Sequence, residues 1–258
     1  MAGLHVEIIG QGEPLVMLHG WGMHGGIWGD TAAQLAQHFE VHCVDLPGHG
    51  ASAPIAAFTL DSVVEHLAAQ FVQPITVCCW SLGGQIALHW AKREPEKLKR
   101  LVMVTSTPCF VERDDWPFGM PQHILLQFAA DLEKNLAATL RRFLGLQVRG
   151  SVGERELLAN LRESLFSRGE PDLNSLRGGL EILRDSDLRS MLPQIKQPTL
   201  VIAGERDKLS PPEASIYLAR TLPNARVVEI EGAAHAPFLS HPDEFVMQLR
   251  RFMENKSD

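Results

Sequence analysis

The fold is decided by the stretch Thr76-Val77-Cys78-Cys79-Trp80-Ser81-Leu82-Gly83-Gly84-Gln85-Ile86-Ala87, in which a short apolar run ends in a serine and a helical pattern follows at once. This order is typical of a nucleophile elbow, a strained strand-to-helix turn that projects the serine hydroxyl above a sheet. The general motif is G-x-S-x-G, and Cys79 stands where the first glycine is expected. Cysteine is small enough for the close approach of strand and helix there. A serine before glycines is also common as a helix N-cap or in a turn, so the rest of the chain has to decide.

Composition and net charge limit the classes of protein to which the chain can belong. The chain has 258 residues, of which 45% are hydrophobic and 21% charged, enough for one large α/β domain with an insertion. Its net charge of -7 argues against nonspecific binding of nucleic acid. No apolar run approaches the roughly 20 residues that a membrane span needs, and the first residues do not resemble a signal peptide. We therefore expect a soluble, cytoplasmic, monomeric protein that binds neither nucleic acid nor membrane.

The four cysteines show no C-x-x-C spacing, which predicts free thiols without disulfides or zinc. The chain also lacks a G-x-G-x-x-G after a strand, a Walker motif and an H-E-x-x-H motif. We therefore expect neither a cofactor nor a metal.

Strand-like and helix-like patterns alternate along most of the chain, which predicts an α/β fold with a mostly parallel sheet flanked by helices. Between residues 109 and 183 no strand pattern occurs, and apolar residues instead recur at helical spacing, as in Leu132, Leu136 and Leu140. The sequence thus predicts a core of residues 1–108 and 184–258 with an inserted helical cap of residues 109–183. The expected strands are residues 4–9, 15–18, 41–45, 75–80, 98–105, 198–203 and 226–230, and the expected core helices are 27–39, 60–71, 83–93, 212–222 and 242–253.

An acid and a histidine follow the last two strands. Asp207 comes shortly after residues 198–203, and His235 follows residues 226–230 in a loop of small residues. Each residue alone is weak evidence of a catalytic site, but the order Ser81, Asp207, His235 is that of α/β-hydrolases. All three residues also lie at the carboxyl ends of expected strands, where open α/β sheets bind ligands. We predict a triad in which His235 takes the Ser81 proton and Asp207 orients His235. Glu205, two residues closer to the strand, is the alternative acid.

Two backbone N–H groups are candidates for an oxyanion hole. One belongs to Leu82, directly after the serine; the other belongs to Trp21 in the turn His19-Gly20-Trp21-Gly22, a place where serine hydrolases of this type carry the second donor. The plainer alternative is a glycine-rich loop that merely turns the chain. Asp45 precedes the nucleophile in a turn-forming context, so we expect it to be structural.

Several longer motifs carry a resemblance that spans nearly the whole chain. The chain resembles the pimeloyl-acyl-carrier-protein methyl ester carboxylesterases of biotin synthesis, which are α/β-hydrolases. The motifs near Ser81 and His235 are shared by α/β-hydrolases in general, whereas those in or beside the expected cap are far more specific. The specific motifs are Ser106-Thr107-Pro108-Cys109-Phe110, Asp115-Trp116-Pro117 and Arg142-Phe143-Leu144-Gly145-Leu146-Gln147.

The resemblance implies hydrolysis of the methyl ester of pimeloyl-acyl carrier protein, with release of methanol and with acyl carrier protein as the partner. It also implies a set of substrate-binding residues, and an apolar cap helix suits a methylene chain, although such residues usually just hold a cap to its core. A general short-chain carboxylesterase or a carbon-carbon bond hydrolase would use the same triad. A noncatalytic scaffold would have no need to retain it. The implied substrate-binding residues are Trp21, Ser81, Leu82, Phe143, Leu144, Gly145, Leu146, Gln147 and His235.

Arginines of the cap offer a candidate docking surface for an acidic carrier protein, formed by Arg141, Arg142, Arg155 and Arg162. The seven-residue interval between Arg155 and Arg162 returns both to one face if the stretch is helical. The interspersed Glu154, Glu156 and Glu163 make an ordinary solvated helix face an equally good interpretation of these residues, and the resemblance favours the docking surface.

Overall fold

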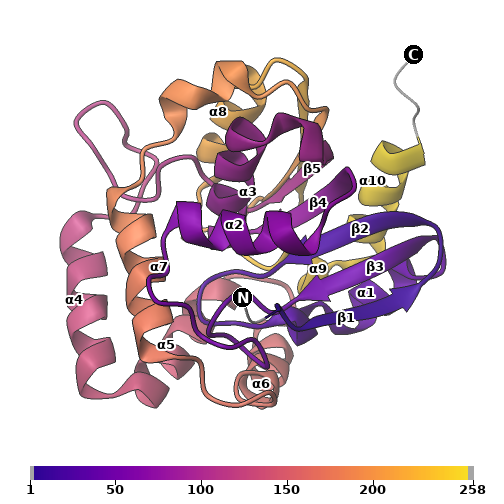
Figure 1. The fold of residues 1–258 in the computed structure, drawn as a ribbon. Helices are drawn as coiled ribbons and strands as arrows, with labels where there is room; N and C mark the ends of the chain where they lie inside the picture. The colour runs from indigo at the N-terminus through magenta and orange to yellow at the C-terminus, as the bar shows by residue number, and fades with distance from the viewer. Residues whose placement is uncertain (1–2, 255–258) are drawn as a thin grey trace.

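A seven-stranded sheet forms the centre of the computed structural model, which describes residues 3–254 (Figure 1). The strand order is β1-β3-β2-β4-β5-β6-β7, and every neighbouring pair is parallel except β1 with β3. The predicted fold class is therefore confirmed. The strands are β1 Val6–Gly10, β2 Glu13–Leu18, β3 Phe39–Val44, β4 Ile75–Trp80, β5 Leu98–Val104, β6 Thr199–Gly204 and β7 Ala225–Ile230.

Burial follows position in the sheet. Every residue of β4 and of β6 is buried, whereas the edge strands β1 and β7 keep several exposed residues. This is the pattern of a parallel sheet covered on both faces, in which central strands become continuous apolar runs.

Helices cover both faces of this sheet. On one face α2 packs against α3, and α8 lies over β6 and β7; on the other, α1 packs against α10 (Figure 1). Thr59 begins α2 with a capping box, in which its side chain accepts from the Ser62 N–H. The helices are α1 Gly29–Leu35, α2 Leu60–Gln70, α3 Leu82–Arg93, α8 Pro212–Thr221, the short α9 Pro237–Ser240 and α10 Pro242–Glu254.

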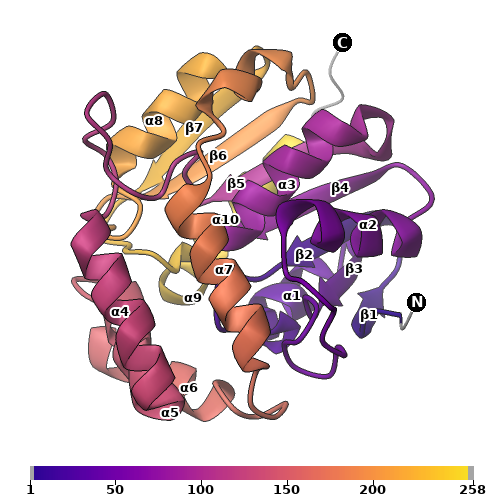
Figure 2. The same cartoon turned by 60° about the vertical axis from the view of Figure 1, so that its left-hand side comes forward.

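Four more helices separate β5 from β6: α4 Gln122–Lys134, α5 Leu136–Val148, α6 Glu154–Ser164 and α7 Leu173–Asp185. They stand together beside the sheet (Figures 1 and 2), with α4 packed on α5 and α7, and α5 on α6. From residue 109 to 183 the described chain adds only isolated β-bridges to the sheet structure. Trp21, which follows β2, packs edge-on against Phe128 of α4 and Phe143 of α5, so these helices meet the end of the sheet where the strands finish.

One expected element is wrong. The predicted helix over residues 27–39 is a 3-10 turn at Gly25–Trp28 followed by the short α1, and Phe39 instead opens β3, where it pairs with Glu13. Sheet pairing overrode the helical periodicity of the sequence at this point. The short α9 was not expected. No helix in the described part of the chain is long and apolar enough to cross a membrane.

Candidate active site

Ser81 occupies a strained turn between β4 and α3. Its φ of 55° and ψ of -117° lie outside the regions that non-glycine residues favour, which is the conformation a nucleophile elbow imposes. The turn is crowded on both sides: a Cβ added to Gly83 would lie 2.9 Å from the carbonyl oxygens of Leu18 and His19. Only a glycine fits there. Ser106, two residues beyond the end of β5, supports the turn, because its hydroxyl donates to the Ser81 carbonyl oxygen over 3.1 Å.

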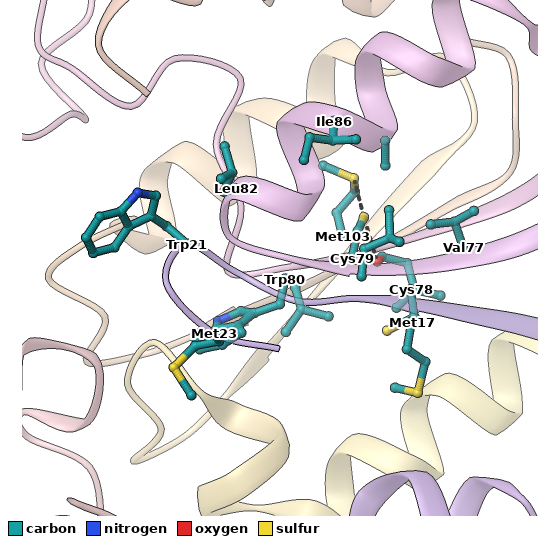
Figure 3. Close-up of a cluster of buried hydrophobic side chains, with 14 of the residues drawn as sticks. Met17, Trp21, Met23, Val77, Cys78, Cys79, Trp80, Leu82, Ile86 and Met103 are labelled. Carbon is teal, nitrogen blue, oxygen red and sulfur yellow. Dashed lines mark hydrogen bonds between the residues drawn. The ribbon is translucent and has the colours of Figure 1, made fainter. Parts of the chain in front are cut away.

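Cys79, at the position of the first motif glycine, is accommodated on the other side of the turn. Its buried sulfur contacts the Val102 carbonyl oxygen at 3.3 Å and the Met103 sulfur at 3.4 Å (Figure 3). Burial raises the pKa of this thiol well above its usual value, so it stays protonated. Cys79 therefore acts as a small packing residue beneath the elbow.

The structure brings Ser81, His235 and Asp207 into one hydrogen-bonded chain. His235 Nε2 lies 2.9 Å from Ser81 Oγ, and His235 Nδ1 lies 2.8 Å from Asp207 Oδ2. A carboxylate can only accept, so the Nδ1–H donates to Asp207 and Nε2 is left to accept the serine proton. His235 and Asp207 are each 1% exposed, so water does not compete for the bond between them. The arrangement can deprotonate Ser81 during attack on a carbonyl carbon.

The second oxygen of Asp207 fixes the carboxylate itself. Oδ1 accepts from the N–H groups of Leu209 and Ser210 at 2.8 and 3.1 Å. Glu205 does something else: its Oε2 accepts from the Gly232 N–H at 2.8 Å, and its side chain is 43% exposed. Glu205 thus joins the two loops that carry Asp207 and His235 without contacting the imidazole.

The candidate oxyanion donors, the N–H groups of Trp21 and Leu82, belong to the two turns beside the nucleophile. A Cβ added to Gly20 would lie 3.2 Å from the Ser81 Cβ, so the turn containing Trp21 abuts the serine. Within residues 3–254, neither the Trp21 nor the Leu82 N–H donates to a protein acceptor. Leu82 also begins α3, whose dipole favours negative charge at this end. Both donors are free to bind a developing oxyanion.

A small apolar cavity lies beside Trp21. Phe143 and Leu146 of α5 line it, whereas the neighbouring Leu144, Gly145 and Gln147 do not. The cavity measures only about 30 Å³, far below the roughly 300 Å³ of a typical ligand pocket. Sequence reasoning missed most of the lining, because those residues come from distant segments: Phe110, Met120, Ile124, Leu125, Phe128, Leu180 and Leu183.

The other implied substrate residues have different surroundings. Leu144 and Gln147 are each 1% exposed, and the Gln147 carbonyl oxygen accepts from the His235 N–H at 3.0 Å. Gly145 faces open space, since an added Cβ would meet nothing within 4 Å. Helix α5 therefore contacts the histidine loop at its end and the cavity in its middle.

Asp45 is fully buried and has a structural role, as expected. Its carboxylate accepts from the Gly25 N–H at 2.6 Å and the Ala51 N–H at 2.9 Å, and it pairs with Arg168, which lies between α6 and α7, at 3.2 Å. Burial alone would raise the pKa of Asp45, but these hydrogen bonds and the nearby positive charge lower it overall. The pair links the core to the segment between α6 and α7.

Two buried histidines lie beside Asp45. Burial lowers the pKa of His19 to about 3 and that of His49 to about 4, so both are neutral at pH 7. His19 Nε2 accepts from the Leu46 N–H at 3.0 Å, so His19 positions the turn after β3 rather than the reacting groups.

The four arginines of the candidate docking surface divide into two pairs. Arg141 lies over the Phe166 ring, and Arg142 pairs with Asp131 at 2.7 Å while lying over Phe128. Arg155 and Arg162 are exposed on α6 and form no ion pair with any residue from 3 to 254. In the same described part of the chain, no cluster of three or more His, Cys, Asp or Glu residues is arranged to hold a metal ion.

Comparison with known proteins places the chain among hydrolases. Residues 13–242 match the family model of the alpha/beta hydrolase fold. The chain is 46% identical over 246 residues to a pimeloyl-[acyl-carrier protein] methyl ester esterase of Nitrosomonas europaea, covering 95% of this chain and 98% of that protein. An enzyme of the same name from Chromobacterium violaceum is 44% identical, covering 98% and 99%. An esterase structure from Exiguobacterium antarcticum shares the fold with a TM-score of 0.89 at 23% identity, covering 98% of this chain and 96% of that one.

Proposed function

The chain belongs to the pimeloyl-[acyl-carrier protein] methyl ester esterases of the alpha/beta hydrolase fold, and from that membership we propose that Ser81, His235 and Asp207 carry out the reaction. The enzyme hydrolyses the methyl ester of a pimeloyl group attached to acyl carrier protein, as a step of biotin synthesis. The observation that supports this mechanism best is the hydrogen-bonded chain from the partly exposed Ser81 through the buried His235 to the buried Asp207.

The first half of the reaction forms an acyl-enzyme. Ser81 Oγ attacks the ester carbonyl carbon while His235 Nε2 takes the hydroxyl proton. The carbonyl oxygen becomes an oxyanion that accepts from the Trp21 and Leu82 N–H groups, and removing one such donor typically costs about 10²- to 10³-fold in kcat. Collapse of the intermediate breaks the bond to the methoxy oxygen, which takes the proton from His235 and leaves as methanol.

The second half releases the acid. Water attacks the pimeloyl ester of Ser81, His235 takes a proton from that water, and the same two N–H groups stabilise the second oxyanion. Collapse returns the proton to Ser81 Oγ and frees a carboxylate on the carrier-linked chain. Throughout, Asp207 keeps the Nδ1–H of His235 in place and stabilises the imidazolium.

We also propose that residues 109–183 form a cap over a core of residues 1–108 and 184–258, and that this cap holds the substrate. Phe143 and Leu146, with Trp21, offer an apolar wall for the methylene chain. The cavity of about 30 Å³ is too small for that chain, so it has to widen when substrate enters. Leu144, Gly145 and Gln147 do not line the cavity, and they contribute to the proposed cap as residues of helix α5.

The direct test is hydrolysis by the purified enzyme of methyl esters of graded dicarboxylate length, both free and carrier-linked, with methanol release as the readout. We expect the carrier-linked seven-carbon ester to give the highest kcat/KM, and Ser81→Ala to lower kcat by about 10⁶-fold while remaining folded. Equal turnover of all short esters would favour a general carboxylesterase. Absence of methanol release from all of these esters would favour a carbon-carbon bond hydrolase.

The cap arginines are the proposed docking surface for acyl carrier protein. Arg155 and Arg162 are the better candidates, because Arg141 and Arg142 already contact neighbours within the cap. Replacing Arg155 and Arg162 with alanine should raise KM for the carrier-linked ester and flatten its salt dependence, while a small free methyl ester reacts as before. Equal loss on both substrates would show that these arginines support the cap instead.

A cytoplasmic location and a monomeric state belong to the same proposal. All four cysteines are buried free thiols, which suits a reducing compartment. Size-exclusion chromatography with light scattering checks the monomer against the 28.6 kDa of one chain.

A further inference from the structure

The backbone of His235 is held as closely as its ring. Its carbonyl oxygen accepts two hydrogen bonds, from Trp80 Nε1 and from Thr105 Oγ1, each 2.7 Å long. Both donor side chains are fully buried, so water cannot replace either bond. Because a backbone carbonyl oxygen has two acceptor sites, these donors saturate it.

The two donors come from adjacent strands at the site of the nucleophile. Trp80 is the last residue of β4 and directly precedes Ser81, while Thr105 directly follows β5. Figure 3 shows the Trp80 indole on the opposite side of β4 from Cys79. Consecutive residues therefore contact His235 at two points: Trp80 bonds its main-chain oxygen and Ser81 bonds its ring nitrogen.

Thr105 adopts an unfavourable backbone conformation to make its bond. Its φ is 41°, and Thr105 and Ser81 are the only non-glycine residues with positive φ in the described part of the chain. For a β-branched residue this conformation is a genuine outlier, and such strain persists where the surrounding structure over-determines it, often at functional sites. Its N–H is fixed by the Ile202 carbonyl oxygen at 2.8 Å, which aims the hydroxyl at His235.

We propose that Trp80 and Thr105 are positioning residues, which hold the His235 carbonyl so that its imidazole stays between Ser81 and Asp207. This inference rests on the proposed triad mechanism and adds two residues to it. A loop of small residues carries His235, so its position has to be imposed from outside the loop. Neither donor lines the apolar cavity, so both should affect the chemical step more than substrate binding.

The test removes one donor at a time, and a control accounts for the smaller ring of the tryptophan variant. Trp80→Phe keeps an aromatic ring but lacks the N–H, and Thr105→Val is isosteric, shares the β-branch and lacks the hydroxyl. Thr105→Ser restores a hydroxyl. Trp90→Phe is the matched control, because Trp90 is also fully buried but its indole nitrogen has no hydrogen-bond partner among the described residues.

Trp80→Phe and Thr105→Val should each lower kcat roughly five- to tenfold, with KM changed less than about twofold. The variant that combines both substitutions should lower kcat by about 10²-fold. The rate of Ser81 labelling by a fluorophosphonate, which needs His235 but not the natural substrate, should fall by the same factors. Thr105→Ser should recover most of the rate, and Trp90→Phe should match the wild type.

Other outcomes would overturn the inference. Unchanged kcat and labelling rates in the folded double variant would show that the carbonyl bonds do not position His235, as would an equal loss in Trp90→Phe. If Trp80→Phe fails to fold, the comparison of Thr105→Val with Thr105→Ser still decides. Failure of the reagent to label Ser81 in the wild type would instead refute the triad mechanism itself.

Discussion

Asp207→Asn tests the triad at the residue for which the sequence offered two candidates. Asp207 Oδ2 accepts the His235 Nδ1–H at 2.8 Å, and Oδ1 accepts two backbone N–H groups. An asparagine has one acceptor oxygen and one NH₂ donor. If the oxygen keeps the Leu209 and Ser210 bonds, the NH₂ faces Nδ1 and forces the imidazole into the tautomer whose Nε2 carries a proton. That nitrogen can no longer accept from Ser81.

The wrong tautomer costs about 10⁴-fold in kcat in the comparable serine protease variant, equivalent to about 5.4 kcal/mol of transition-state stabilisation. We expect a loss of this size for Asp207→Asn, with KM little changed because Asp207 does not line the cavity. The fold should survive, since the amide oxygen retains the backbone bonds. The assay is steady-state methanol release, with thermal unfolding measured in parallel.

Glu205→Gln is the matched control. It makes the same carboxylate-to-amide change two residues away, and its amide oxygen can still accept from the Gly232 N–H. Its kcat should stay within about threefold of the wild type, because a neutral hydrogen bond replaces one to a carboxylate at a half-exposed site. A loss below tenfold in Asp207→Asn, or a comparable loss in Glu205→Gln, would refute the assignment of the acid.

Three further predictions concern packing, the cap and pH. Cys79→Gly should keep activity, whereas Cys79→Leu should lower the free energy of unfolding by about 1–3 kcal/mol and reduce kcat, because the sulfur already contacts Val102 and Met103. A fully stable and active leucine variant would show that strand β4 and helix α3 pack less tightly at the elbow than these contacts indicate. Gly145→Ala should raise the free energy of unfolding by about 0.5–1 kcal/mol, because the residue is helical and an added methyl group meets open space. A lowered kcat/KM in this more stable variant would place Gly145 against the substrate, whereas a loss of stability would contradict the open site. His19 and His49 have folded pKa values of about 3 and 4, below the ordinary value of 6.5, so below pH 6.5 the unfolded chain binds more protons than the folded chain. The free energy of unfolding measured in urea should therefore fall from pH 6.5 toward pH 4, by at most about 1.4 kcal/mol per pH unit for each histidine. A flat profile over this range would contradict the burial of both histidines as neutral groups.

The sequence by itself determined the sheet, the elbow and the order of the reactive residues. These features are local: the strand Ile75–Trp80, in which only Thr76 is polar, the glycines after Ser81, and the loops before Asp207 and His235 can each be recognised within about ten residues. The resemblance carried by the motifs between residues 106 and 147 gave the substrate class, and the near-full-length relatives bear it out.

Only the tertiary structure decided which groups meet. Asp207 and Glu205 stand in one loop, and only the approach of the His235 loop shows which carboxylate reaches Nδ1. Phe39 carries a helical pattern in the sequence, yet pairing with β2 places it in a strand.

The same holds for contacts between distant segments. The cavity joins Trp21 to helices α4, α5 and α7, and Trp80 and Thr105 reach a carbonyl oxygen 155 and 130 residues away in the chain. Such contacts leave no periodic trace in the sequence, because they arise from the packing of whole elements rather than from the conformation of neighbouring residues.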